Sequence, residues 1–318
     1  MKKLSILALI ISAAVIGCKK NKTSTATQTR PVSIGIAKII THPALDSIEQ
    51  GIKDELAERG YTDIRYNVQN ANGELSTAST IANMFRNEKV DIAVGIATPT
   101  ALALANQIKD RPVIFSAVTD PVGAGLHKSL DAEPGNIAGV SDMAPVKAQI
   151  QLIADLKPVK RIGHIYTPSE ANGVSMKDMA QAACDEMGIE LVLATVTNTS
   201  EIKQAAEILA PKVDAIYVSN DNTVVAALSS LTETATRYGV PVISADPSSA
   251  PTSGVTIAYG IDNYQTGRAT GIMISQILEG AKPSELPVKV MDQPHELAGY
   301  IDPELVKRFE LTVPAYME

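Results

Sequence analysis

VDIAVGIATPTALALANQIKDRPVIFSAV (residues 90–118) contains two apolar runs separated by a helical segment. The runs at 90–97 and 111–118 are short and rich in Val, Ile and Ala, which is typical of buried strands. Residues 98–110 have helical character, and Pro99 near their start has a backbone angle suited to the first turn of a helix. A strand–helix–strand unit of this kind predicts parallel strands in a sheet covered by helices.

The same alternation extends along the chain in both directions. Upstream, strand-like runs at 32–39 and 63–70 alternate with helical segments at 44–60 and 76–89. A second set begins at 161–167 and continues to 240–246, after a Gly-rich stretch at 134–143 that suits a crossover. We therefore predict an α/β fold of two Rossmann-like lobes with parallel sheets.

The tail of the chain, from residue 254 onward, adds a further strand, a long helix and two more strand-like pieces. A tail that continues both patterns suggests that the chain crosses between the lobes more than once and so forms a hinge. We expect lobe 1 to comprise residues 31–138 plus about 259–289, and lobe 2 to comprise residues 139–258 plus about 290–318.

The first 17 residues have the features of a signal peptide. Lys2 and Lys3 precede an apolar segment, residues 4–16, that is too short to span a bilayer comfortably. The segment ends in VIGC, which resembles a bacterial lipobox and implies lipid attachment at Cys18; the alternative is an ordinary signal peptide with a coincidental cysteine. Residues 18–30, rich in Thr and Lys, are interpreted as a flexible tether. We expect an extracytoplasmic protein held at a bacterial membrane surface by its lipid.

Composition and motifs exclude several classes of function. The net charge of -7, the absence of Trp and an aromatic content of 4% argue against a nucleic-acid partner. Cys184 is the one cysteine of the body, so no internal disulfide is expected, and we interpret it as a core residue. The four histidines are scattered, which makes a metal site improbable. Neither a phosphate loop nor a nucleophile–base motif is present, so neither an enzyme nor a cofactor is expected.

Polar side chains follow six of the predicted strands, at the points where helices begin. The carboxyl ends of parallel strands lie at one edge of a sheet, so two lobes that face each other would bring these residues to one cleft. The candidate ligand-binding residues are His42, Thr98, Pro99, Thr100, Asp120, Glu170, Asn172, Ser219, Asn220, Asp221, Asn222 and Asp246.

The chemistry of these residues suits a zwitterion such as an amino acid. Carboxylates pair with an ammonium group, and free backbone N–H groups at helix starts bind a carboxylate. The competing interpretation is that many of these side chains only cap helices, since Asp, Asn and Ser accept hydrogen bonds from the first turn. The two interpretations differ most for the run Ser219–Asn222, because one polar residue is enough to cap a helix and this run has four.

An ordered set of segments gives the chain a family resemblance. ITHPALDSIEQGIKDELAERGY, DIAVGIATPTALALAN, VIFSAVTDPVGAGL, PGNIAGVSD, YTPSEANGVSMKDM and IYVSNDNTVVAAL resemble the substrate-binding lipoproteins of ABC transporters, whose members include tryptophan, tyrosine and phenylalanine binders. The resemblance runs from about residue 32 to the C-terminus and implies a type I periplasmic-binding-protein fold, with three crossovers and a ligand enclosed by closure. Where the family often has Ser, this chain has Gly173.

The resemblance implies a solute receptor that delivers an amino acid, with an aromatic one favoured, to an ABC permease. A lipid-anchored sensory protein that signals to a membrane partner would use the same cleft. A nucleoside or sugar remains an alternative ligand, although sugar sites usually stack the ring on aromatic side chains, which are sparse here. Tyr217, Tyr259 and Tyr264 are the few aromatic residues expected near the cleft.

Overall fold

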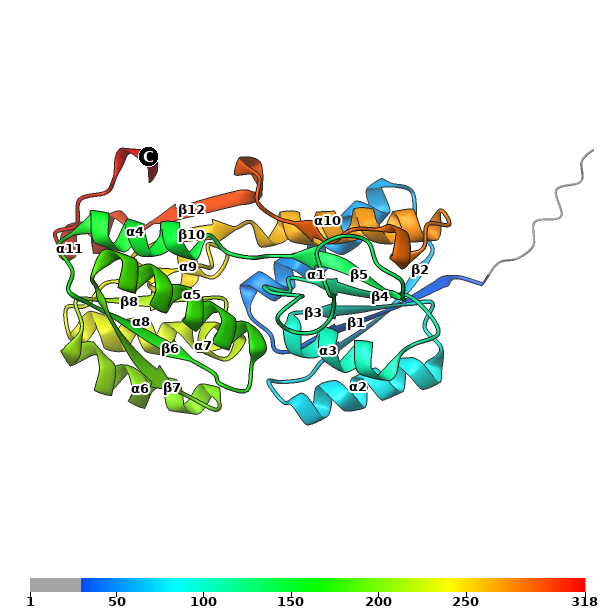
Figure 1. Cartoon of the computed structure of the whole chain (residues 1–318), viewed down its shortest axis with the longest axis horizontal. Helices are drawn as coiled ribbons and strands as arrows, with labels where there is room; N and C mark the ends of the chain where they lie inside the picture. Colours follow the sequence, from blue (N-terminus) through cyan, green and yellow to red (C-terminus); the bar gives the residue numbers. More distant parts are fainter. Residues whose placement is uncertain (1–29, 318) are drawn as a thin grey trace, which may run out of the picture. The chain divides into compact units, whose positions relative to one another are not determined.

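Two six-stranded sheets, one in each lobe, form the framework of the protein (Figure 1). The computed structural model describes residues 30–317. The predicted signal peptide, Cys18 and all of the predicted tether except Arg30 lie outside the described residues. Within residues 30–317, no helix combines the length and the apolar character that a membrane crossing requires.

The first sheet has the strand order β11-β5-β4-β3-β1-β2, and all neighbouring strands in it are parallel. Its strands are β1 (Val32–Lys38), β2 (Ile64–Asn70), β3 (Ile92–Ile96), β4 (Val113–Ser116), β5 (Ile137–Ser141) and β11 (Lys289–Val290). Its helices are α1 (Pro43–Glu58), α2 (Leu75–Glu88), α3 (Thr98–Gln107) and α10 (Asn263–Leu278). The packed pair α1 and α10 covers one face, and the pair α2 and α3 covers the other (Figure 1).

The second sheet repeats this plan with the order β12-β10-β9-β8-β6-β7. Its strands are β6 (Arg161–Tyr166), β7 (Glu190–Thr195), β8 (Ala215–Val218), β9 (Val242–Ser244), β10 (Ile257–Ile261) and β12 (Leu297–Ile301). Its helices are α4 (Val146–Leu156), α5 (Ala171–Met187), α6 (Ile202–Leu209), α7 (Asn222–Ala226), α8 (Leu228–Arg237), α9 (Ala250–Ser253) and α11 (Pro303–Arg308). Helix α4 packs on α5, and α6 packs on α8.

The sheets differ in one respect from the expected all-parallel arrangement. Strand β12 is antiparallel to β10, with Leu297 opposite Ile261 and Ile301 opposite Ile257. The reason lies in the chain path. Strand β10 runs toward the first lobe and continues into α10, whereas β12 begins where the chain returns from that lobe, so the two strands run in opposite directions.

The order of the first five strands is the same in both lobes, β2-β1-β3-β4-β5 and β7-β6-β8-β9-β10. In this doubly wound order the direction of winding reverses between β1 and β3, and again between β6 and β8. Crevices at such switch points, beyond the carboxyl ends of the strands, are the usual ligand sites of α/β sheets. The topology therefore predicts a ligand site at the loops after β1, β3, β6 and β8.

The chain passes between the lobes three times, as the family resemblance implied: after β5, after β10 and between β11 and β12. Strand β5 pairs with β4 and extends to Ser141, and β10 pairs with β9 and extends to Ile261. Two of the crossings therefore lie a few residues beyond the ends expected from the sequence at 138 and 258.

Each lobe has its own hydrophobic core. Every residue of β3 is buried, as a strand covered by helices on both faces requires. Gly95 in β3 permits close packing of α3, because a Cβ atom at this position would lie 2.6 Å from the Cα atom of Ala101. Cys184 is fully buried in the core of the second lobe, which confirms its interpretation as a core residue.

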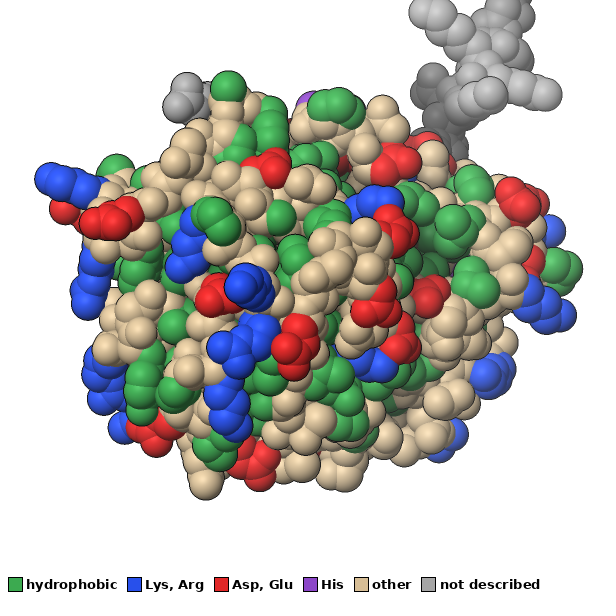
Figure 2. All heavy atoms as spheres, turned by 60° about the vertical axis from the view of Figure 1, so that its left-hand side comes forward, with side chains coloured by type: hydrophobic (Ala, Val, Ile, Leu, Met, Phe, Trp, Pro, Cys, Tyr) green, Lys and Arg blue, Asp and Glu red, His purple; other side chains and the backbone are tan. Residues whose placement is uncertain are grey.

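The charged side chains visible in Figure 2 are mixed in sign. Lys and Arg lie among Asp and Glu, with hydrophobic side chains between them. Several acidic and imidazole groups from the strand ends are buried instead, including His42, Asp142 and Asp246, which are at most 7% exposed. Burying such groups is costly unless they are paired or functional. These buried groups therefore indicate a functional site in the interior between the lobes.

Candidate functional site

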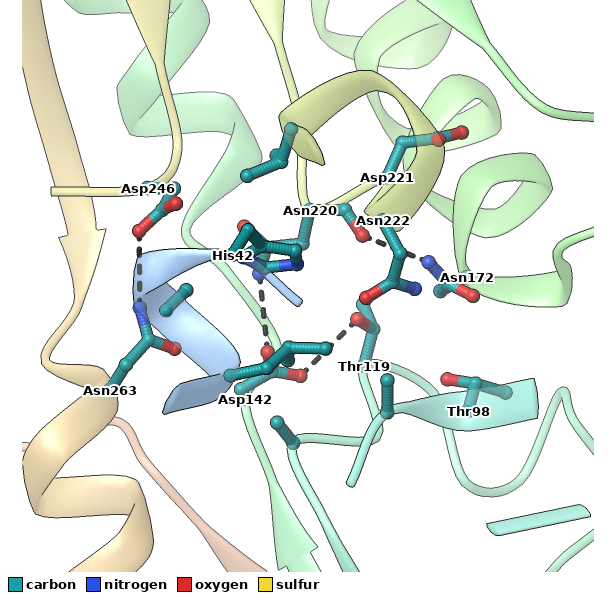
Figure 3. A pocket seen from close by; sticks show the side chains of 15 residues that line it. His42, Thr98, Thr119, Asp142, Asn172, Asn220, Asp221, Asn222, Asp246 and Asn263 are labelled. Atoms are coloured by element: carbon teal, nitrogen blue, oxygen red, sulfur yellow. Dashed lines mark hydrogen bonds between the residues drawn. The ribbon is translucent and has the colours of Figure 1, made fainter. Parts of the chain in front are cut away.

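A pocket between the two lobes collects residues from the ends of many strands (Figure 3). Its empty volume, which includes space open to solvent, is about 390 Å³. The lining residues are His42, Ala44, Leu45, Ala97, Thr98, Ala117, Thr119, Asp142, Asn172, Asn220, Asp221, Asn222, Val225, Asp246 and Asn263.

Two carboxylates face one part of this pocket. Asp246 Oδ1 accepts hydrogen bonds from the Ser248 N–H at 2.9 Å and from Asn263 Nδ2 at 3.2 Å. Asp246 Oδ2 is buried and has no hydrogen-bond partner among the described residues. Asp142 accepts hydrogen bonds from the Thr119 hydroxyl at 3.2 Å and from Asn220 Nδ2 at 3.3 Å. This part of the pocket therefore offers unsatisfied negative charge.

The electrostatics of the two carboxylates favour a cationic ligand group. Burial raises the pKa of Asp142 to about 6, and the neighbouring Asp246 carboxylate acts in the same direction. The hydrogen bonds from Thr119 and Asn220 lower the pKa but do not offset the effect of burial. A positive ligand group near Asp142 would lower its pKa and favour its ionised form.

An amide cluster, Asn172, Asn220 and Asn222, lines another part of the pocket, and Glu170 holds it in place. Asn172 Nδ2 donates to the backbone oxygen of Asn220 at 2.8 Å, and Asn222 Nδ2 donates to Glu170 Oε2 at 2.5 Å. Glu170 also accepts hydrogen bonds from the N–H and the hydroxyl of Thr223, at 3.2 and 2.8 Å. Asn172 Oδ1 is buried without a partner in the described part of the chain, so a ligand donor can bind it.

Three long helices begin at the pocket. Ala44 and Leu45 belong to the first turn of α1, Thr98 begins α3, and Asn172 is the second residue of α5. Within the described residues, no side chain caps any of these three helices. Their first N–H groups lack intrahelical partners, and their dipoles place a partial positive charge there, so together they can bind an anion.

The short helix α7 is different, because carboxylates already occupy its N-terminus. The N–H groups of Asn222 and Thr223 donate to Glu170, and the N–H of Val224 donates to Asp221 Oδ1 at 3.1 Å. A ligand carboxylate would be repelled at this helix start. The anion-binding capacity of the pocket therefore belongs mainly to α1 and α3, since Glu170 is also the residue directly before α5.

Asp221 lines the pocket, as expected, and its carboxylate also has a structural role. Its carboxylate accepts three hydrogen bonds, from the Thr167 N–H at 2.6 Å, the Thr167 hydroxyl at 2.9 Å and the Val224 N–H. Figure 3 shows it directed away from His42 and Asp142. Burial and the nearby Glu170 charge raise the pKa of Asp221 to about 7. The capping interpretation therefore describes this residue better.

Gly173 fits against the same carboxylate. A Cβ atom at residue 173 would lie 2.6 Å from Asp221 Oδ2 and 3.1 Å from the backbone oxygen of Thr167. In this chain a serine side chain would therefore approach Asp221 rather than the pocket. The glycine is explained by packing, and it does not by itself remove a ligand contact.

His42, Thr98, Asn172, Asn220, Asn222 and Asp246 line the pocket as the sequence led us to expect. His42 lies just before α1, and both of its ring nitrogens are buried without a partner in the described residues. Burial lowers the pKa of His42, so the neutral imidazole is favoured. A neutral ring has one donor and one acceptor available to a ligand.

The other expected residues lie next to the pocket without lining it. The Thr100 hydroxyl donates to the backbone oxygen of Ile96 at 2.6 Å, and Pro99 occupies the first turn of α3. Asp120 accepts the N–H of Gly123 at 2.8 Å and, across the lobes, the hydroxyl of Ser175 at 3.3 Å. Glu170 positions the amides, as described above, and Ser219 is fully buried. A strand-end position therefore does not ensure a side chain in the cavity.

Sequence reasoning missed two polar lining residues, Asp142 and Asn263. Both follow strands at which the chain leaves one lobe for the other, β5 and β10. The signal was present, because VSD and IDN each place polar residues directly after an apolar run. Thr119 lines the pocket as well. Thr119 also follows strand β4, but we favoured the neighbouring Asp120 as the candidate ligand-binding residue because it is charged.

Two alanines at the pocket have unusual backbone angles. Ala97, with φ of 78°, precedes α3, and Ala117, with φ of 54°, follows β4. Residues other than glycine at positive φ cost about 1–3 kcal/mol each and persist where the surrounding structure imposes them. Both alanines line the pocket, so two of the five such residues in the described part of the chain lie at the candidate site.

Small and branched apolar side chains, together with the polar groups, form the pocket wall. Ala44, Leu45, Ala97, Ala117 and Val225 contribute this surface, and no aromatic residue of the described chain is among the lining residues. Tyr217, which was expected near the cleft, is fully buried and donates its hydroxyl hydrogen to Gln149 at 2.6 Å. The described residues also contain no cluster of three or more His, Cys, Asp or Glu residues able to hold a metal ion.

Comparisons with known proteins agree with this architecture. A family model described as "ABC transporter substrate binding protein" matches residues 33–314. A protein of Clostridioides difficile named "Tyrosine-binding protein" is 33% identical over 309 residues, which cover 92% of this chain and 89% of that protein.

Two solved structures are similar over most of their length. The structure of an ABC domain from Streptococcus pneumonia in complex with L-Trp is 35% identical, with a TM-score of 0.85 over 90% of this chain and 97% of that chain. The ligand-free, open structure of a substrate-binding protein with adhesive properties from Clostridium difficile is 31% identical, with a TM-score of 0.66 over 89% and 96% of the two chains.

Proposed function

Because the chain belongs to the ABC transporter substrate-binding proteins, which bind solutes and are not enzymes, we propose that its interlobe pocket binds a free amino acid. An aromatic amino acid is the favoured ligand. The protein would bind it outside the cytoplasm and deliver it to an ABC permease. Attachment to the membrane by a lipid at Cys18 is part of the proposal.

The proposal of an amino acid rests on one observation: the pocket contains groups that can bind a cation and groups that can bind an anion. Asp246 Oδ2 is buried and unpartnered, and Asp142 lines the same pocket, so two carboxylates are available to attract an ammonium group. The uncapped starts of α1 and α3 supply N–H donors for a carboxylate. A ligand with only one of these charges would leave the other set of buried groups unsatisfied.

The preference for an aromatic side chain rests on the relatives and on the apolar part of the wall. The related proteins are named for tyrosine or contain L-Trp. Ala44, Leu45, Ala97, Ala117 and Val225 can contact a flat ring without competing for its polar groups. A sugar is disfavoured because no aromatic side chain of the described residues lines the pocket to stack on it.

The described arrangement of the lobes supports closure around the ligand as the functional motion. The chain is more similar to the L-Trp complex than to the ligand-free, open protein, although the two sequence identities are close. Two hydrogen bonds connect opposite sides of the interface, from Asn220 to Asp142 and from Ser175 to Asp120. We take this arrangement as the closed form, which a ligand that touches both lobes would favour.

Thermal unfolding of the full chain with a panel of amino acids, nucleosides and sugars tests the proposal. A ligand at 100 times its Kd stabilises the folded state by about 2.7 kcal/mol, which gives a clear rise in Tm. We expect the largest rise with tryptophan, tyrosine or phenylalanine. If nucleosides or sugars raise the Tm and no amino acid does, the proposal is wrong.

A further inference from the structure

A second hollow lies next to the ligand pocket and shares part of its wall. This outer groove has an empty volume of about 580 Å³. Of its lining residues, His42 and Val225 also line the ligand pocket. The two hollows are therefore separated where these two side chains stand.

His42 and Val225 come from opposite lobes. His42 lies just before α1 and is 7% exposed, whereas Val225 is in α7 and is 5% exposed. Because each side chain lines both hollows, we treat the pair as the partition between them. Neither His42 nitrogen makes a hydrogen bond of good geometry to another described residue, although the Asn222 side chain lies close enough to affect the pKa of the ring.

The outer groove has a polar lining rich in hydroxyl groups. Thr41, Ser229, Ser249 and Thr252 contribute to it, and the buried Ser249 hydroxyl has no hydrogen-bond partner in the described chain. A hydroxyl can donate and accept, which matches the N–H and C=O of a peptide group. The groove is thus chemically suited to an extension of an amino acid by one more residue.

We propose that His42 and Val225 act as a size filter that restricts the pocket to single amino acids and excludes dipeptides. This inference rests on the proposed function, because it concerns the same ligand. A ligand with a second residue would have to pass these two side chains to reach the outer groove. Replacing both side chains by alanine would join the pocket to the outer groove. One residue of a dipeptide could then occupy each hollow.

The test compares full-length wild-type protein with the double variant His42→Ala/Val225→Ala by calorimetric titration. The ligands are the tightest-binding aromatic amino acid and its two dipeptides with glycine, one at each end. Thr252→Ala is the matched control, because Thr252 lines the outer groove but not the ligand pocket. Thermal unfolding of each variant establishes that it is folded before titration.

We expect wild-type protein and the control to bind the free amino acid and neither dipeptide. The double variant should bind at least one dipeptide, with a Kd at least tenfold lower than that of wild type. Three outcomes would overturn the filter: wild-type protein binds the dipeptides, the folded double variant gains no dipeptide binding, or the control gains as much. If wild-type protein fails to bind the amino acid itself, the proposed function fails as well, so the two failures are distinguishable.

Discussion

Replacing Asp246 by asparagine should remove most of the ligand affinity while leaving the fold nearly intact. The side chain has two oxygens with separate roles. Oδ1 accepts hydrogen bonds from the Ser248 N–H, the Ser249 N–H and Asn263 Nδ2, at 2.9, 3.4 and 3.2 Å. Oδ2 is buried and has no partner in the described chain, which leaves it free for a ligand ammonium. Asparagine can keep the first role and cannot perform the second.

The expected loss of ligand affinity follows from the separate roles of the two Asp246 oxygens. Truncating one partner of a buried charge pair costs about 2–5 kcal/mol of binding. That range corresponds to an increase in Kd of about 30-fold to several thousand-fold. Folding stability should change by no more than about 1 kcal/mol, the net value of one hydrogen bond, because the Oδ1 acceptor remains.

Isothermal titration calorimetry at pH 7.5 with the best amino acid, together with thermal unfolding, measures both quantities. Asp221→Asn is the matched control, since Asp221 lies at the same site and its carboxylate is bound to the protein. If Asp246→Asn leaves the Kd within about threefold of wild type, the pairing of Asp246 with an ammonium group is refuted.

Three further predictions follow from the geometry. Asp221→Asn should lower folding stability by about 1–3 kcal/mol by chemical denaturation, because at least one donor from Thr167 or Val224 loses its acceptor, with little change in Kd; a large loss of affinity at unchanged stability would contradict this. Asp142 has a pKa raised from 3.8 to about 6, so affinity should be constant above pH 6 and fall below it by at most about tenfold per pH unit, with protons released on binding. In the ligand-free protein the raised pKa of Asp142 has the opposite effect on folding. The free energy of unfolding should increase as the pH falls from 6 toward 3.8, because the folded state binds the Asp142 proton more tightly than the unfolded state does. Gly173→Ala should cost about 1–3 kcal/mol of stability, because its Cβ would contact the Asp221 carboxylate, and an unchanged Tm would refute that packing.

The sequence was sufficient to predict the two lobes because period and composition determine which segments form buried parallel strands. Strand β3 is an example, since an apolar run with a helix on each side has few alternatives. The antiparallel β12 could not be predicted, because its direction depends on where the chain re-enters the second lobe. No local pattern encodes that path.

The candidate site was predictable to the level of loops and less so to the level of side chains. His42, Asn220 and Asp246 follow strands and line the pocket, as expected. Asp221 also follows a strand, but its carboxylate is bound by Thr167, a residue 54 positions away in the sequence. Such a long-range hydrogen bond determines which way a side chain points, and a single sequence contains no direct record of it.

The central claim is that the pocket recognises both charged ends of an amino acid. Competition titration of the full chain with L-tryptophan, its decarboxylated amine and its deaminated acid tests this most directly. Each analogue leaves one set of buried groups unsatisfied, so both should bind at least about tenfold more weakly than the parent, a loss of 1.4 kcal/mol or more. If either analogue binds as tightly as L-tryptophan, the carboxylates or the helix starts have no role in recognition, and the claim is contradicted.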